Sequence, residues 1–307
     1  MDAKKEVRIS QKKAKRNFTT IGLMLMIYVL FVMIFPYVFV EYMKLTNSSI
    51  LEDKILYYGI YFIVILFGTI IPFFIMRKFA RIKFRRIFRM ANVGFFDVFV
   101  QTIVLFTVCI VLTYVSNVIF SRFGLDGKLI ASIGFSYDEV NLSNHIYLFM
   151  LILVTPILEE YAFRGVLLTA LGKYGKRFAL IASSLIFAFA HNNFAEMIPA
   201  CAMGFILGKI ALRYRSVQPT VIIHILFNGF IYLLCILPAT ITKYMTYGLA
   251  AICILALYLI LTGRYEWIQV QSSRSAKITR SLFYTRFTIV LTMMLMVGYT
   301  LLFTITN

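Results

Sequence analysis

Long apolar runs constrain this chain more than any other feature of its sequence. About twenty consecutive apolar residues are enough for a helix to cross the hydrocarbon core of a bilayer, and such runs recur along all 307 residues. Hydrophobic residues make up 61% of the chain and charged residues 14%, against roughly 25% charged in ordinary soluble domains. We therefore predict an all-α fold, a polytopic transmembrane helical bundle.

The number of membrane spans is expected to be eight or nine. Two short members joined by the polar stretch HNNFAE leave the count open. The predicted spans cover residues 18–40, 55–76, 96–120, 145–171, 178–195, 197–214, 217–237, 243–263 and 287–305.

Lysine and arginine are distributed unevenly between the two sides of this bundle. With the N-terminus in the cytoplasm, 26 of the 31 basic residues fall on inside segments, as the positive-inside rule requires. We therefore predict a cytoplasmic N-terminus and a C-terminus on the outer side. The net charge of +18 then indicates contact with anionic lipids. Nucleic acid is not an expected partner, because no basic groove interleaved with aromatic residues is visible.

The chain divides into four parts. A basic cytoplasmic tail (1–17) precedes N-terminal transmembrane helices (18–144), which include a basic segment at 77–89. A core that holds the polar motifs (145–240) is followed by C-terminal transmembrane helices (241–307). The basic segment alternates charged and apolar residues at helical spacing. This pattern is typical of an interfacial amphipathic helix that binds anionic lipid, or of a topological anchor.

Two adjacent carboxylates interrupt the apolar span at 145–171, within the stretch TPILEEYAFRG. A charged residue near the centre of a span costs about 2.5 to 3.5 kcal/mol, so the pair needs compensation. Glu160 precedes Arg164 by four residues, which favours an ion pair on one helix face. Glu159 points in a different direction and remains available for chemistry. One glutamate would suffice for a structural ion pair, so the second favours a functional role.

Two of the three histidines also lie in predicted spans. His191 ends FAFAH, four residues after Phe187, and His224 opens HILFN, four residues before Asn228. Each alone is explained as a hydrogen-bonded packing residue. Counted from the span ends, however, both histidines, Glu159 and Asn228 fall at similar depth. We therefore predict that these polar side chains meet in one cavity.

Taken in order, three motifs resemble those of the CPBP (CAAX protease and bacteriocin-processing, Abi) family of intramembrane glutamate or metallo-endopeptidases. They are EExxxR (159–164), FxxxH (187–191) and HxxxN (224–228), and the resemblance covers residues 145–237. It implies that 145–240 is the catalytic core of an endopeptidase in a cell membrane. The substrate would be a membrane-associated peptide or protein. Short loops without endoplasmic-reticulum signals favour a bacterial plasma membrane.

The resemblance also implies a role for each motif residue. Glu159 corresponds to the general base that activates water together with His191. His224 and Asn228 correspond to the pair that stabilises the oxyanion. The supporting residues are Glu160 and Arg164. These residue types suit peptide hydrolysis, which needs a deprotonated water, a proton donor for the leaving amine and donors for the oxyanion.

Metal dependence and the class of function stay open at this point. Two histidines and a carboxylate can hold zinc, but the HExxH motif is absent, so zinc is left open as a cofactor without assigned ligands. Two alternatives to an endopeptidase remain. One is a non-catalytic CPBP-like scaffold that regulates a membrane-protein partner, and the other is an ion-coupled transporter. The inverted repeats and paired broken helices typical of transporters are not visible.

Overall fold

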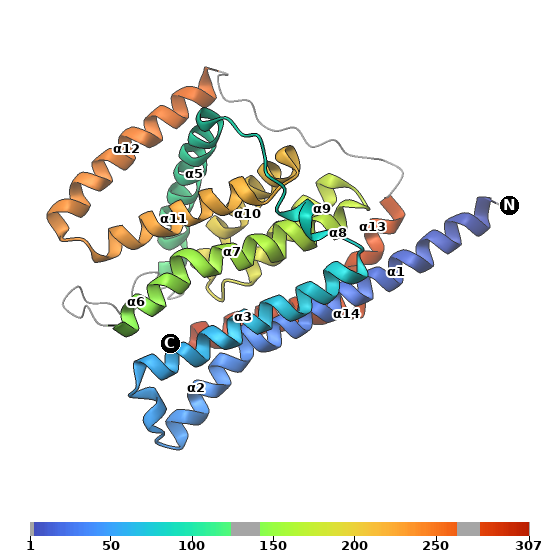
Figure 1. Cartoon of the computed structure of the whole chain (residues 1–307), viewed down its shortest axis with the longest axis horizontal. Coiled ribbons are helices and arrows are strands. Elements are labelled where there is room, and N and C mark those ends of the chain that lie inside the picture. The colour runs from blue at the N-terminus through green and yellow to red at the C-terminus, as the bar shows by residue number, and fades with distance from the viewer. Residues whose placement is uncertain (1–2, 124–141, 263–276, 307) are drawn as a thin grey trace.

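The structure, a computed structural model, describes residues 3–123, 142–262 and 277–306. Every regular element in these ranges is a helix (Figure 1), so the predicted helical membrane bundle is confirmed. The α-helices are α1 (Ala3–Tyr28), α2 (Phe35–Leu45), α3 (Lys54–Phe79), α4 (Phe84–Ile87), α5 (Phe95–Ser121), α6 (Leu142–Phe149), α7 (Thr155–Glu159), α8 (Leu168–Gly172), α9 (Lys176–Phe189), α10 (Phe194–Tyr214), α11 (Gln218–Ile236), α12 (Ala239–Leu261), α13 (Lys277–Tyr284) and α14 (Phe287–Thr306). The shorter segments are the π-helices η1 (Val29–Ile34), η4 (Met150–Val154) and η5 (Glu160–Leu167) and the 3-10 helix η2 (Ser49–Leu51).

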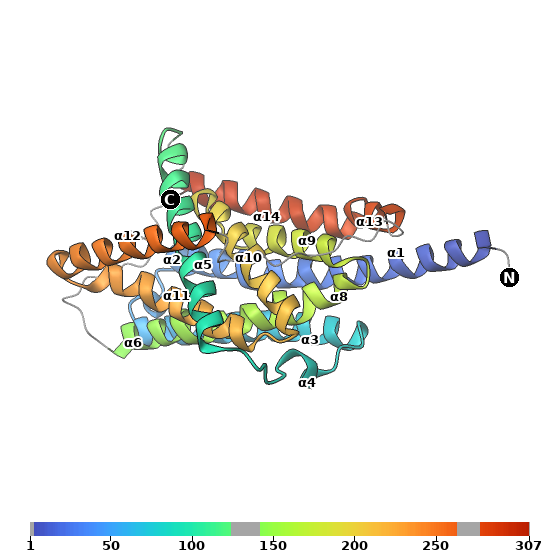
Figure 2. The ribbon, with the colours of Figure 1, turned by 90° about the horizontal axis from the view of Figure 1, so that it is seen from above.

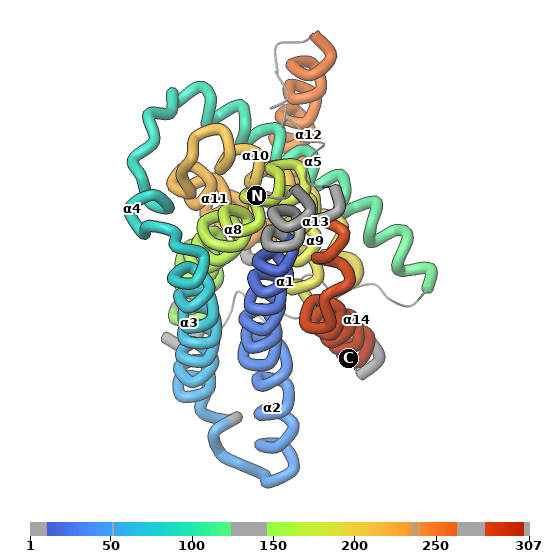
Figure 3. Tube along the Cα trace, turned by 90° about the vertical axis from the view of Figure 1, so that its right-hand side faces the viewer, coloured from blue at the N-terminus to red at the C-terminus, as the bar shows by residue number. Residues whose placement is uncertain are grey.

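One layer of the bundle consists of α3, the α1–η1–α2 rod and α14, which lie side by side in Figures 1 and 3. The close approach of α14 to α1 depends on Gly22, because a Cβ there would lie 2.3 Å from Thr288 Oγ1. Thr292 donates its hydroxyl hydrogen to the Gly22 carbonyl at 3.1 Å. The first and last predicted spans therefore pack against each other without a bulky side chain between their backbones.

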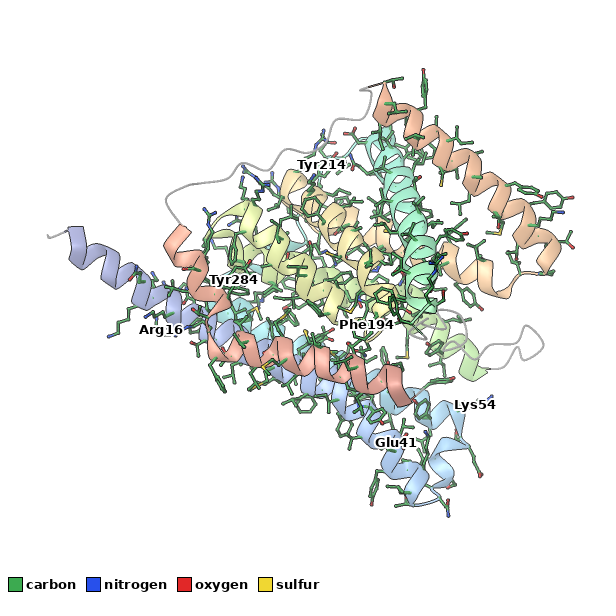
Figure 4. The ribbon with its side chains drawn as sticks, turned by 180° about the vertical axis from the view of Figure 1, so that it is seen from behind. Arg16, Glu41, Lys54, Phe194, Tyr214 and Tyr284 are labelled. Atoms are coloured by element: carbon green, nitrogen blue, oxygen red, sulfur yellow. The ribbon has the colours of Figure 1, made fainter. Side chains whose placement is uncertain are left out.

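The two ends of this layer can be followed in Figure 4. Arg16 and Tyr284 mark one end, while Glu41 and Lys54 mark the other. The N-terminus lies at the Arg16 end (Figure 1). The end marked by Arg16 is therefore the one that charge distribution predicts to face the cytoplasm.

A second layer, built from α6 to α11, contains all three motifs. The segments α6, η4, α7, η5 and α8 follow one another without a break from Leu142 to Gly172. In a π-helix each amide bonds to the carbonyl five residues earlier, which widens the turn. Leu168 N bonds in this way to the Phe163 carbonyl. All eight residues of η5 are buried, so the widened turn lies inside the protein.

Two further helices complete the bundle. α5 contacts α10, and α12 contacts α5. α12 reaches away from the other helices at the end opposite the N-terminus (Figures 1 and 2). Its apolar side chains Ile254 and Leu261 are exposed, as expected for a helix that faces acyl chains.

The described residues include six helices that are long and apolar enough to cross a membrane, and two shorter apolar helices, α11 and α14. The predicted span 178–195 is wrong, because α9 has 14 residues and ends at Phe189. At 1.5 Å per residue it measures about 21 Å, less than the ~30 Å hydrocarbon core. A turn at His191 and Asn192 separates it from α10. The number of crossings, the orientation and the four-part division of the chain stay predictions.

The basic segment 77–89 does not form one continuous amphipathic helix. α3 ends at Phe79, and Arg81 adopts a left-handed backbone with φ 55°, which helices do not tolerate. Only the single turn α4 follows, and its Ile87 is buried in the core. Val217 N donates to the Ile87 carbonyl at 3.0 Å, which attaches this segment to the start of α11. The continuous amphipathic helix is therefore wrong, whereas the interfacial position of the segment, its contact with anionic lipid and its anchor role stay predictions.

Candidate active site

A cavity of about 310 Å³ lies between α5, the α6–α8 rod, α10 and α11. This volume is at the low end of the range for ligand pockets. The structure brings all four residues predicted to be catalytic into its lining, and their chemical roles stay predictions. The carboxylate, imidazole and amide side chains that line it are Glu159, His191, Glu196, His224 and Asn228.

Glu160 and Arg164 form an ion pair beside this cavity, as their spacing predicts. Arg164 Nη1 lies 2.7 Å from Glu160 Oε1, and the two residues are 3% and 0% exposed. Because a π-helical turn holds more than four residues, side chains four apart in η5 lie nearly above one another. The Phe187 ring covers the other side of the guanidinium, 4.1 Å from its carbon to the ring centroid. The aromatic residue of FxxxH therefore contacts the arginine of EExxxR.

His224 lies between the two glutamates. Its Nδ1 is 2.9 Å from Glu160 Oε1, and its Nε2 is 3.7 Å from Glu159 Oε2. An ionised Glu160 can only accept a hydrogen bond, so Nδ1 of His224 carries a proton. The other ring nitrogen, Nε2, is the one nearer Glu159. Donation from Nε2 to a substrate oxygen then requires the doubly protonated imidazolium. The HxxxN spacing predicts that His224 acts with Asn228, but it does not predict the contact of His224 with both carboxylates.

Glu159 differs from Glu160 in its access to the cavity. Its side chain is 21% exposed, while that of Glu160 is 0% exposed. Glu159 is also a lining residue, and Glu160 is not. The prediction that one glutamate is held by arginine while its neighbour stays accessible therefore agrees with the geometry.

His191 lies in the turn after α9 rather than within a span, which corrects the sequence prediction. Its Nδ1 is 2.9 Å from the Phe187 carbonyl at the end of that helix. A carbonyl only accepts, so Nδ1 carries the hydrogen and, in the neutral ring, Nε2 keeps its lone pair. The four-residue spacing in FxxxH thus fixes the tautomer of His191. The remaining nitrogen can accept a proton.

Asn228 makes a hydrogen bond that follows from a proline in the facing helix. In η4, Thr155 N bonds to the Met150 carbonyl, five residues earlier. The same pattern would pair the Leu151 carbonyl with Pro156, which has no N–H. Asn228 Nδ2 instead donates to the Leu151 carbonyl at 3.0 Å. An amide nitrogen carries two hydrogens, so one can still donate into the cavity.

Glu196 is a site residue that sequence reasoning missed. It lines the cavity from the first turn of α10, where Asn193 is the N-cap. Asn193 Oδ1 accepts from Ala195 N at 2.9 Å, and its Nδ2 donates to Glu196 Oε1 at 3.3 Å. An N-cap residue followed three positions later by glutamate resembles a capping box. That signal in HNNFAE could have placed Glu196 at the start of a helix facing His191.

The residues present do not fit a zinc site with three protein ligands. In the part of the chain that the structure describes, no group of three His, Cys, Asp or Glu side chains lies at ligand spacing. A catalytic zinc site normally uses three such ligands and one open position. We therefore assign no step of the chemistry to a metal.

Comparisons with known proteins match the same part of the chain. Residues 141–230 match the family model described as type II CAAX prenyl endopeptidase Rce1-like. The chain is 36% identical over 93 residues to the membrane-embedded CAAX protease MroQ of Staphylococcus aureus (strain USA300). That alignment covers 28% of this chain and 38% of MroQ, so the chain matches less than half of its curated relative. No solved structure shows a significant match to the chain.

Proposed function

We propose that this chain is an intramembrane endopeptidase, because residues 141–230 match the type II CAAX prenyl endopeptidase Rce1-like family model and 93 residues are 36% identical to a membrane-embedded CAAX protease. Its substrate would be a membrane-associated peptide or protein. The observation that carries this proposal is the shared cavity, in which a partly exposed carboxylate and two imidazoles face one space.

The proposed reaction begins with a water molecule in the cavity. Glu159 accepts a proton from the water as its oxygen attacks the scissile carbonyl carbon. His191 then receives this proton at Nε2 and transfers it onward. Only Nε2 is available, because Nδ1 is hydrogen-bonded to the Phe187 carbonyl. The proton then reaches the leaving amine, and the C–N bond breaks. A positioned acid or base of this kind contributes about 10²–10⁴-fold to the rate.

The oxyanion of the tetrahedral intermediate would be held by Asn228 and His224. Asn228 can donate its second amide hydrogen, while its first holds the Leu151 carbonyl. His224 can donate from Nε2 when it is imidazolium, because Glu160 holds Nδ1. Arg164 keeps Glu160 ionised and oriented, so these two residues act by positioning His224. Removal of one oxyanion donor typically costs about 10²–10³-fold in rate.

The deciding experiment compares peptides released from membranes of cells that express the wild type or Glu159→Gln. The matched control is Glu52→Gln, the same chemical change at an exposed position. We expect Glu159→Gln to fold and insert, yet to leave at least one natural substrate uncut, while the control behaves as wild type. An unchanged peptide pattern, together with purified protein that cuts nothing, would remove the enzyme proposal.

The same variant distinguishes the two alternative functions. A scaffold keeps its partner and its cellular effect after Glu159→Gln, whereas a peptidase loses its effect. An ion-coupled carrier shows solute flux in proteoliposomes, which a peptidase does not require. Zinc dependence is tested separately, by measuring the metal content of the purified protein and its activity after chelation.

A further inference from the structure

A second pocket, of about 520 Å³, lies where several helices end together. It is bounded by the turn after α3, by α4, by the end of α8 and by the link from α10 to α11. Figure 3 shows α4, α8 and α11 at the end of the molecule from which the N-terminus projects. The basic side chains that line this pocket are Arg81, Arg86, Arg164, Lys173, Lys176 and Arg215.

No aspartate or glutamate is among the described residues that line this basic pocket. Lys173 donates to the Ala80 carbonyl at 2.6 Å, which holds this cation at the edge of the opening. Burial, together with the positive charges of Lys13 and Arg81, lowers the pKa of Lys173. The cations therefore repel one another, and an anion between them would relieve the repulsion.

Two of these arginines hold unusual backbone conformations. Arg81 has φ 55° and Arg215 has φ 52°, both in the left-handed region. The other positive-φ residues apart from glycine, among those the structure describes, are both asparagines, Asn47 and Asn192. Asparagine visits this region far more readily than arginine, and strained residues of this kind cluster at functional sites. Both arginines with this unfavourable backbone conformation therefore line the same pocket.

The base of the pocket contains an incompletely paired cation. Arg164 is 3% exposed and lines the pocket from η5. Its Nη1 contacts Glu160, but its Nη2 has no hydrogen-bond partner within the described part of the chain. A buried guanidinium donor without an acceptor is costly. Both terminal guanidinium nitrogens are buried from solvent, so Arg164 would act on an anion in the pocket through its positive charge rather than by direct contact.

The geometry points to a binding site for a phosphate group, which we assign to the headgroup of an anionic phospholipid. Phosphate oxygens match a cluster of arginine and lysine donors. The candidate spans Lys54–Phe79, Ile146–Gly172 and Phe194–Tyr214 all end at this pocket, which places it at headgroup depth. Apolar side chains, including Ile82 and Leu168, line the same pocket and can contact the glycerol and upper acyl chain. This site is separate from the proposed catalytic cavity and would exist whether or not the chain is a peptidase.

The test uses the purified full-length protein in detergent micelles and two double variants of equal charge. Arg86→Gln with Lys176→Gln removes two pocket cations. Arg85→Gln with Arg177→Gln removes two exposed neighbours, each one position along the chain, that do not line the pocket. Retained lipid is counted by native mass spectrometry with phosphatidylglycerol and, separately, phosphatidylcholine of the same chain length. Glycerol phosphate and inorganic phosphate are added in further arms, with melting temperature as the readout.

We expect the wild type to retain phosphatidylglycerol over phosphatidylcholine, and the pocket variant to bind it at least about tenfold more weakly, the scale of one lost charged hydrogen bond. The control variant should bind as wild type. Stabilisation by inorganic phosphate that only the pocket variant loses would support the site and identify free phosphate as its ligand. Equal loss in both variants, or no loss in either, would overturn the site in favour of diffuse surface charge. If the double variant fails to fold, Lys176→Gln against Arg177→Gln makes the same comparison.

Discussion

The two pockets of this protein carry opposite chemistry although one helical segment separates them. The described lining of the proposed catalytic cavity includes Glu159 and Glu196 but no lysine or arginine. That of the basic pocket includes six arginines and lysines but no carboxylate. Between them, η5 holds Glu160 toward the cavity histidine and Arg164 at the base of the basic pocket. The intramembrane ion pair thus forms the boundary between an acidic and a basic compartment.

The largest expected effect belongs to the cavity alone. His191→Asn should lower peptidase activity by about 10²–10⁴-fold, because the acceptor nitrogen that takes the proton is lost. Activity is measured on a substrate that the wild type cuts and Glu159→Gln leaves uncut in the peptide comparison. Folding is checked by the melting temperature. Phosphatidylglycerol binding should not change. Activity within a few-fold of wild type would remove His191 from the proposed chemistry.

The second largest effect is expected from Arg164→Met, which should alter both pockets because it removes the ion pair that lies between them. Arg164→Met leaves the buried Glu160 without its arginine and with only the contact to His224, and removal of one partner of a buried ion pair typically costs about 3–5 kcal/mol of stability. We expect lower stability in equilibrium unfolding from mixed micelles, weaker phospholipid retention and low activity.

The control for this variant is the double change Glu160→Gln with Arg164→Met, which removes both charges. It should recover much of the lost stability without recovering activity, since a glutamine can still accept from His224 Nδ1 but no longer supplies the negative charge that favours the imidazolium form. Equal stability of the single and double variants would show that the ion pair does not matter to the fold.

A smaller effect is expected from a change at the wall of the basic pocket. Gly165→Ala would place a Cβ 2.6 Å from Ile87 Cγ2, which presses α4 away from η5. Overpacking of this kind costs about 1–3 kcal/mol, measured as a shift in the unfolding midpoint. Gly172→Ala is the matched control, because nothing lies within 4 Å of the Cβ it would add. Equal unfolding midpoints of the two variants would show that α4 can move away from η5 at little cost in stability.

The smallest effect concerns the far rim of the cavity. Asn193→Ala removes the N-cap of α10 and the hydrogen bond to Glu196, at a cost of about 1 kcal/mol. Asp53→Ala removes the N-cap of α3 and should cost about the same. Only Asn193→Ala should also lower activity, because only that cap orients a cavity side chain. An equal effect of both on activity would show that Glu196 takes no part.

The sequence predicts well the features that depend on residues within a single helix. Apolar runs predicted the helices, and the spacing of Glu160 and Arg164 predicted their ion pair. What sequence reasoning missed depends on departures from the ordinary α-helix. No residue pattern announced the π-helical turns, so the contacts of His224 with both glutamates were not foreseen.

The ends of short helices were equally hard to predict. His191 was placed inside a span because FAFAH is apolar, but the polar residues that follow it end α9 and form a turn. The predicted spans place Glu196 between two helices, whereas the N-cap Asn193 starts α10 two residues before it. One of the two interpretations of the basic segment 77–89, an interfacial helix, fails because Arg81 breaks the helix. In each case a local backbone change decided where the side chain lies.

The bond from Asn228 to the Leu151 carbonyl also bears on how a substrate can enter. It joins α11 to the α6–α8 rod, and the proline in that rod provides no alternative donor. Parting these two helices would break this bond and leave the Leu151 carbonyl without its protein donor, at a cost of about 1–3 kcal/mol for a buried acceptor. We therefore expect a membrane-embedded polypeptide to enter the cavity between other helices. α11, which carries the HxxxN motif, would then keep its position during substrate entry and product release.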